Sequence, residues 1–110
     1  MIVRGFPAAY IGLYDMLRQT AIDNGYALAI HGSLAKDMDL IAAPWTDEAI
    51  EGKKLVELFV EQLGMVCQEG VTVLSPDNEI CKGKKPHGRL AWNIMLGSSA
   101  YIDISIMPRS

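Results

Sequence analysis

The chain has 110 residues, of which 50% are hydrophobic and 21% are charged, and its formal net charge is −3. This length suits a single domain, residues 1–110, with one hydrophobic core. The net negative charge excludes the basic surface with which proteins neutralise many phosphates, so strong nucleic-acid binding by this domain alone is not expected. A small phosphate-bearing ligand fits better, because a metal ion can supply the missing positive charge.

The sequence shows neither a membrane span nor an export signal. No apolar run approaches the ~20 residues that a spanning helix needs. The N-terminus lacks a charged region followed by a long apolar stretch and a cleavage site. Cys67 and Cys81 have no second pair beside them, which argues against a four-ligand zinc site and a disulfide framework. We therefore expect a soluble, cytoplasmic protein that does not enter a membrane.

The first half of the chain predicts one helix and two strands. Apolar residues recur at helical spacing from Phe6 to Asn24, and Gly25 follows at the position of a C-terminal cap. The apolar positions of this helix are Ala9, Ile11, Leu13, Tyr14, Leu17 and Ala21. The apolar run from Tyr26 to His31 predicts a buried strand, and a second strand is expected from Asp37 to Ala43, ended by Pro44.

The link between these strands, Gly32 to Lys36, is too short for a parallel crossover and predicts an antiparallel hairpin. The clearest helix of the chain comes next. Thr46 is a suitable N-cap, and apolar residues recur at helical spacing from there to Gly64. Trp45 and Trp92 are expected in the core or at its rim, and not as platforms for stacking bases.

The C-terminal half predicts further strands. Met65 to Ser75 reads as one short strand or an irregular hairpin, and Pro76 to Gly88 has the composition of an exposed loop. Arg89 to Leu96 and Ala100 to Met107 read as two strands of a hairpin that turns at residues 97–99.

Alternation along this last hairpin predicts its register. A three-residue loop places Asn93 opposite Asp103 and brings the apolar faces of the two strands into line. The apolar pairs matched in this way are Ile94 with Ile102, Trp92 with Ile104 and Leu90 with Ile106. Together the elements predict an α+β, two-layer fold, in which a small mixed or antiparallel sheet carries both helices on one face.

The chemistry is expected where two aspartates share a strand face. Asp37 and Asp39 are one residue apart, so their carboxylates point the same way and favour a divalent cation between them. The preceding Gly32-Ser33 turn offers backbone N–H groups and a hydroxyl to phosphate oxygens. Asp103 interrupts an apolar strand and would bring a third carboxylate to the same face. The competing interpretation is that all three are solvated surface charges.

These residues resemble the signature of the DNA polymerase beta-like nucleotidyltransferase superfamily, in its minimal, single-domain form. The matching features are Gly32-Ser33, the Asp37-x-Asp39 pair and Asp103, and the similarity in element order extends from Phe6 to Pro108. The resemblance implies a nucleotidyltransferase-like fold in which Asp37, Asp39 and Asp103 are catalytic and hold Mg²⁺ or Mn²⁺. It also implies a nucleoside triphosphate as donor, bound through Gly32, Ser33 and Lys36, and an acceptor of unknown identity.

One departure from the family pattern leaves other functions open. Only residues 34–36 separate the Gly-Ser turn from the first aspartate, where the superfamily usually has a longer segment with a short helix. The alternative is a catalytically degenerate domain that binds a nucleotide or a partner protein. A helical companion or a homodimer would then cover an exposed apolar helix face. A third hypothesis is an unrelated metal phosphoesterase that uses the same carboxylates to activate water.

Overall fold

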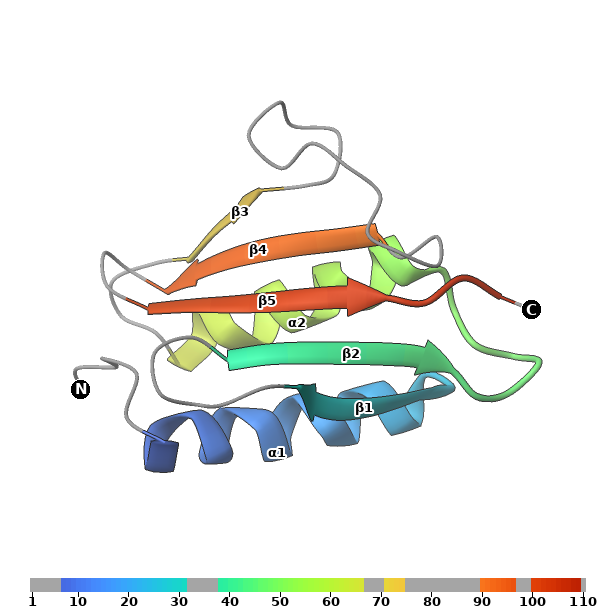
Figure 1. The fold of residues 1–110 in the computed structure, drawn as a ribbon, viewed down its shortest axis with the longest axis horizontal. Coiled ribbons are helices and arrows are strands. Elements are labelled where there is room, and N and C mark those ends of the chain that lie inside the picture. The colour runs from blue at the N-terminus through green and yellow to red at the C-terminus, as the bar shows by residue number, and fades with distance from the viewer. Residues whose placement is uncertain (1–6, 32–37, 67–70, 75–89, 97–99, 110) are drawn as a thin grey trace.

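The computed structural model describes residues 7–31, 38–66, 71–74, 90–96 and 100–109. The elements are α1 (Pro7–Asp23), β1 (Tyr26–His31), β2 (Met38–Pro44), α2 (Gly52–Val66), β3 (Val71–Leu74), β4 (Leu90–Leu96) and β5 (Ala100–Ile106). The strands form one sheet in the order β1-β2-β5-β4-β3. Both helices lie on one side of this sheet (Figure 1). The predicted α+β fold is confirmed, and neither described helix is long and apolar enough to cross a membrane.

The sheet is mixed because two antiparallel units meet through one parallel contact. β1 and β2 form the predicted antiparallel hairpin, and β4 pairs antiparallel with both β3 and β5. The predicted register of the last hairpin is also confirmed, since Asn93 lies opposite Asp103 and Trp92 lies opposite Ile104. The contact that joins the two units is the parallel pairing of β2 with β5.

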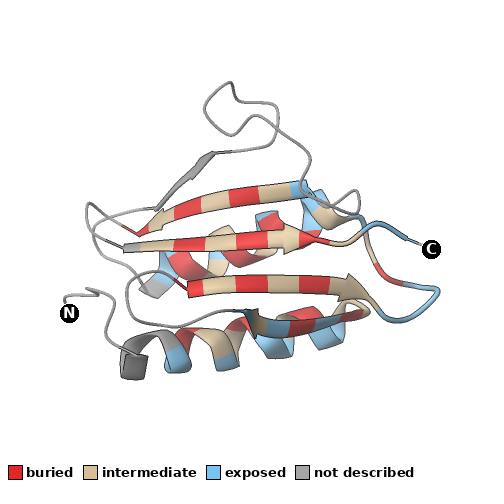
Figure 2. Ribbon diagram, viewed as in Figure 1, coloured by how far each residue is buried: buried red, intermediate tan, exposed pale blue. Residues whose placement is uncertain are grey.

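Strand alternation decides which face of the sheet becomes the core. Along β2, β4 and β5, buried positions alternate with half-buried ones, as the colours of Figure 2 show. The fully buried side chains with the largest volumes are Phe59, Leu17, Met38, Leu40, Leu55, Leu63, Ile94, Ile102 and Ile104. Each such side chain contributes roughly 1.5–3 kcal/mol of transfer free energy to folding. The opposite face of the sheet is not covered by either helix and is called the open face below.

The buried side of α1 is narrower than the sequence predicts. Leu13, Leu17 and Ala21 are buried at successive i+4 positions. Ile11 was expected beside them, but 54% of its surface is exposed, so that prediction is wrong. The reason is angular: at about 100° per residue, Ile11 lies roughly 200° around the helix from Leu13.

Helix α2 begins later than predicted, at Gly52 instead of directly after Thr46. The intervening segment is bound to the end of α1 by backbone hydrogen bonds. The Gly25 carbonyl accepts from the Thr46 amide at 3.2 Å, and the Asn24 carbonyl accepts from the Ile50 amide at 3.2 Å. A helix that began directly after Thr46 would need the Ile50 amide to donate to the Thr46 carbonyl, so it could not keep the bond to Asn24.

Gly25 follows the end of α1, as predicted, and two features of this position require glycine. Its φ is 88°, in the left-handed region that glycine adopts most readily. A β-carbon at this position would also lie 2.6 Å from both the Ala49 Cα and the Thr46 Oγ1.

We predict that Gly25→Ala lowers the free energy of unfolding by about 2–4 kcal/mol, because it combines an unfavourable φ with a backbone clash. Urea denaturation followed by circular dichroism measures this change. The matched control is Gly64→Ala in α2, where a β-carbon meets nothing within 4 Å. The control should raise stability by up to about 1 kcal/mol, because it adds helix propensity. Equal effects of the two substitutions would contradict the view that the backbone conformation and its surroundings require glycine at position 25.

Tyr26 fastens the same turn from the strand side. Its side chain is buried, and its hydroxyl donates to the Ile50 carbonyl at 2.7 Å. Burial raises the pKa of the Tyr26 phenol, the Arg109 guanidinium opposes this shift and the Glu51 carboxylate adds to it. The neutral hydroxyl is therefore the form that the folded state favours.

We predict that Tyr26→Phe costs about 1 kcal/mol near neutral pH, because it deletes one part-buried hydrogen bond. The raised pKa means that this stabilisation is complete below about pH 10 and is lost as the pH rises further. The difference between wild type and variant should therefore shrink as the pH is raised above this value in urea titrations. Tyr101→Phe is the control for loss of one phenol, and a gap that stays constant up to the highest pH would contradict the prediction.

Candidate functional site

Four polar side chains form a row across adjacent strands of the open face. His31 pairs with Asp39, Asp39 pairs with Asp103, and Asp103 pairs with Asn93. His31 is exposed and the other three are half-buried. Neighbouring strands lie about 4.8 Å apart, so the row is about 14 Å long. We call these four residues the polar row.

The next row along the same face consists of small or aliphatic side chains. Ala29 pairs with Ile41, Ile41 with Ser105, and Ser105 with Ala91. Two of these four positions are alanines, which extend little above the sheet. A ligand that contacts the polar row therefore has a low surface beside it on which to lie.

Asp39 and Asp103 are the chemically informative pair. They are direct partners on two parallel strands, and both residues are half-buried. Two negative charges at this spacing repel each other, and partial burial reduces the screening that water provides. A divalent cation between them would convert this repulsion into attraction, and hard oxygen ligands suit Mg²⁺ or Mn²⁺.

Asn93 orients one of these carboxylates. Its Nδ2 donates a hydrogen bond to Oδ1 of Asp103. A hydrogen bond of this kind fixes the rotamer of a carboxylate and so sets the direction in which it could meet a cation. The sequence placed Asn93 opposite Asp103, but it did not show that the amide bonds the acid.

The remaining predicted site residues lie outside the described residues. These are Gly32, Ser33, Lys36 and the predicted metal ligand Asp37. Within the described ranges no group of three or more His, Cys, Asp or Glu side chains is placed to hold a metal ion. Of the three predicted carboxylates, the structure thus brings together Asp39 and Asp103. His31 lies exposed at the end of the polar row.

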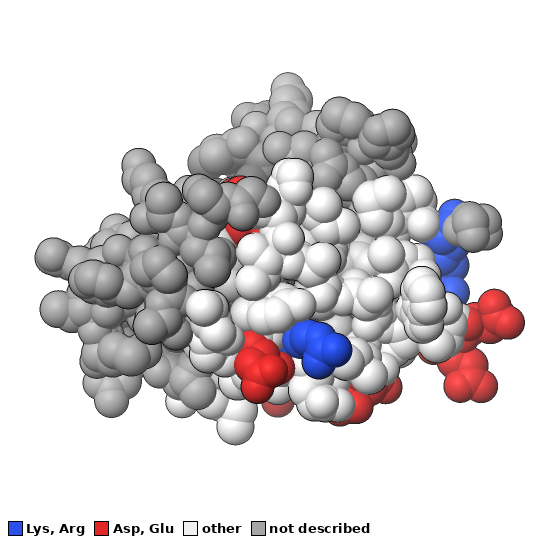
Figure 3. Space-filling model, turned by 60° about the horizontal axis from the view of Figure 1, so that its bottom comes forward, with Lys and Arg blue, Asp and Glu red and all other residues white. Residues whose placement is uncertain are grey.

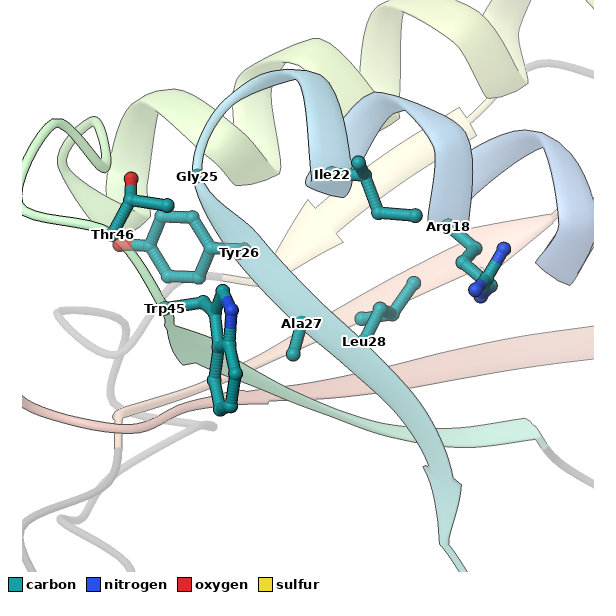
Figure 4. Close-up of a pocket in the computed structure, with 8 residues that line it drawn as sticks. All are labelled: Arg18, Ile22, Gly25, Tyr26, Ala27, Leu28, Trp45 and Thr46. Atoms are coloured by element: carbon teal, nitrogen blue, oxygen red, sulfur yellow. The ribbon is translucent and has the colours of Figure 1, made fainter.

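A separate hollow lies at the outer edge of the sheet. Figure 3 shows a broad area of the surface without Lys, Arg, Asp or Glu, and the charged residues in this view lie mainly along its lower and right-hand margins. The hollow encloses about 420 Å³ between α1, the edge strand β1 and the segment that follows β2. Arg18 and Ile22 of α1, Ala27 and Leu28 of β1, and Trp45 surround it (Figure 4).

Trp45 was expected in the core or at its rim, but 80% of its surface is exposed. Trp92, by contrast, is buried as expected. Trp45 lies far from the Asp39–Asp103 pair, because Asp39 is the second residue of β2 and Trp45 follows the last. Six residues of strand extend for about 20 Å. We therefore treat the hollow and the polar row as two independent features.

Comparison with known proteins assigns neither feature. No protein-family model matches this chain, and no curated protein sequence matches it either. The interpretation of the polar row consequently depends on its own geometry and chemistry.

We predict that Asp39→Asn raises the free energy of unfolding of the metal-free protein by up to about 1 kcal/mol, because it removes one of two adjacent like charges. Thermal denaturation in a chelator at about pH 8 tests this, and the gain should fall at high salt. Glu61→Gln, on the exposed side of α2, is the matched control and should change little. A clear loss of stability in Asp39→Asn would show that this carboxylate is structural.

Proposed function

We propose that this protein is a Mg²⁺-dependent nucleotidyltransferase, which transfers a nucleotidyl group from a nucleoside triphosphate to an acceptor. The observation that carries the proposal is the direct pairing of Asp39 with Asp103 on parallel strands of the open face. Adjacent carboxylates repel each other and a cation between them would relieve that repulsion, which favours a functional role over a structural one. The resemblance of the Gly-Ser and Asp-x-Asp segment to this superfamily supports the same reaction.

The donor set of the polar row fits a hard divalent cation. Asp39 and Asp103 supply carboxylate oxygens, and Asp37 is the third ligand that the sequence adds to the proposal. Mg²⁺ usually keeps several waters and takes only one or two protein carboxylates together with substrate phosphates. When bound, the metal would supply charge stabilisation at the transferred phosphorus and activation of the attacking hydroxyl.

The protein groups around the cation would position the reactants. Asn93 holds Asp103 through the Nδ2–Oδ1 hydrogen bond. Gly32, Ser33 and Lys36 are proposed to contact the triphosphate, in keeping with their place directly before the Asp-x-Asp segment. The low row that contains Ala29 and Ala91 would leave room for the ligand beside the carboxylates. The cytoplasm, where nucleoside triphosphates and Mg²⁺ are both abundant, is the proposed location.

The test is pyrophosphate release from each nucleoside triphosphate with Mg²⁺ or Mn²⁺, with a panel of hydroxyl-bearing acceptors. Asp39→Asn and Asp103→Asn should each lower turnover by roughly 10³-fold, which corresponds to about 4 kcal/mol of lost transition-state stabilisation. Asn93→Ala should cost less, about 10- to 100-fold, because it acts through Asp103. Glu61→Gln is again the control and should keep full activity.

A thermal-shift assay separates the proposal from its alternatives. Ligands that bind only the folded form raise its melting temperature, so metal and nucleotide should stabilise wild type and not Asp39→Asn. Stabilisation without pyrophosphate release would instead indicate a degenerate nucleotide-binding domain. Release of phosphate from a monoester, without transfer, would indicate the phosphoesterase. Absence of any shift with any metal or nucleotide would refute the nucleotide site itself.

A further inference from the structure

Helix α1 carries a second stripe of residues, on the side away from the core. Ile11, Asp15, Arg18 and Ile22 are all exposed, with Ile11 at 54% and Ile22 at 46%. Their spacings of four, three and four residues keep them within about 60° of one another around the helix. We call these four residues the α1 stripe. Exposed positions recur along the visible side of α1 in Figure 2.

The α1 stripe is complementary to itself. Read from either end, its order is apolar, charged, charged, apolar, and the two charges are opposite in sign. If a second helix is laid antiparallel across it, with the two-fold axis between Asp15 and Arg18, each residue meets a suitable partner. Ile11 of one copy faces Ile22 of the other, and Asp15 faces Arg18. Isologous interfaces require this reciprocal relation, since residue i contacts j and j contacts i.

The surroundings favour a second copy over solvent. Ile11 and Ile22 are two of the large apolar side chains that the described surface exposes, and Trp45 is another. Gly12 lies beside the stripe, and a β-carbon there would meet nothing within 4 Å, so a neighbouring helix can approach closely. The hollow is lined by Arg18 and Ile22 and therefore adjoins one end of the stripe.

We infer that two copies of this chain associate through an antiparallel α1–α1 contact, with two symmetry-related Asp15–Arg18 ion pairs between Ile11–Ile22 contacts. Ile11 of the second copy would lie at the mouth of the hollow, next to Ile22. The stripe extends over about 17 Å of helix, whereas a standard interface takes about 800 Å² from each partner. We therefore expect a weak dimer, in line with the small contact area. This inference does not depend on the proposed function.

Charge reversal tests the contact, because the two-fold axis doubles the effect of each substitution. Asp15→Arg alone should weaken the dimer by at least about tenfold, and Arg18→Asp alone should do the same. The double variant Asp15→Arg/Arg18→Asp exchanges the two charges and should restore dissociation to within about threefold of wild type. Sedimentation velocity from about 1 µM to 500 µM provides the dissociation constants.

Mixing the two single variants distinguishes a contact between copies from one within a copy. Each variant alone should dimerise at least about tenfold more weakly than wild type, but a one-to-one mixture should form a heterodimer, because the basic stripe of Asp15→Arg meets the acidic stripe of Arg18→Asp. An ion pair within one helix cannot produce that result. Glu57→Arg, on the exposed side of α2, is the matched control and should leave the dimer unchanged.

Two further measurements test the inference by means other than charge reversal. Raising the salt concentration should weaken the wild-type dimer, because solvent-accessible ion pairs are screened. Ile22→Asn should weaken it as well, without a change in net charge. A wild-type chain that stays monomeric at the highest concentration would overturn the inference. A dimer that is indifferent to both single reversals and to Ile22→Asn would overturn it equally.

Discussion

The parallel contact between β2 and β5 holds the sheet together. On one side of it lies the hairpin of β1 and β2, and on the other lie β5, β4 and β3. The two strands are far apart in sequence, so the entropy of closing the intervening chain opposes their contact and must be offset by packing. Met38 pairs with Ile102 and Leu40 with Ile104, and all four side chains are buried beneath the helices. This apolar seam stabilises the junction.

The same seam sets the geometry of the polar row. Side chains alternate along a strand, so the register that buries Met38 against Ile102 also places Asp39 beside Asp103 on the open face. A slip of one residue would turn one carboxylate into the core, at a cost far greater than the repulsion between the two acids. The hydrophobic core therefore enforces the close approach of two like charges. Fold stability and candidate chemistry depend on one constraint.

Local patterns in the sequence were sufficient for the elements and for both hairpins. The alternation of Ile102, Asp103 and Ile104 predicted a strand, its two faces and its partner positions, because period-two burial leaves little freedom of register. The parallel pairing of β2 with β5 was not predicted, since no short-range pattern specifies which distant edges meet. The proximity of Asp39 and Asp103 was consequently inferred only from a shared face.

Errors arose where tertiary bonds override local propensity. Thr46 has the features of an N-cap, but the Ile50 amide, which would donate to the Thr46 carbonyl in such a helix, donates to Asn24, and the helix starts at Gly52. Ile11 fitted a loosely drawn apolar face, whereas three-dimensional packing selects the tighter i+4 set of Leu13, Leu17 and Ala21. A pattern of apolar residues at helical spacing does not reveal which of them will lie exposed on the folded chain.

The proposed metal site and the proposed dimer contact lie on different faces of the molecule and are compatible with each other. The polar row is on the open face of the sheet, while α1 packs on the opposite face and directs its stripe away from the core. Association through α1 therefore leaves the carboxylates of both copies accessible to a metal and a nucleotide. The dimer contact would also cover apolar side chains of α1 next to β1. Within one copy, the edge strand β1 is bonded to α1 by the Tyr14 hydroxyl, which donates to the Leu28 carbonyl at 2.8 Å. An edge strand with exposed alanines is prone to pair with other chains, so a helix-mediated dimer beside it would limit that association.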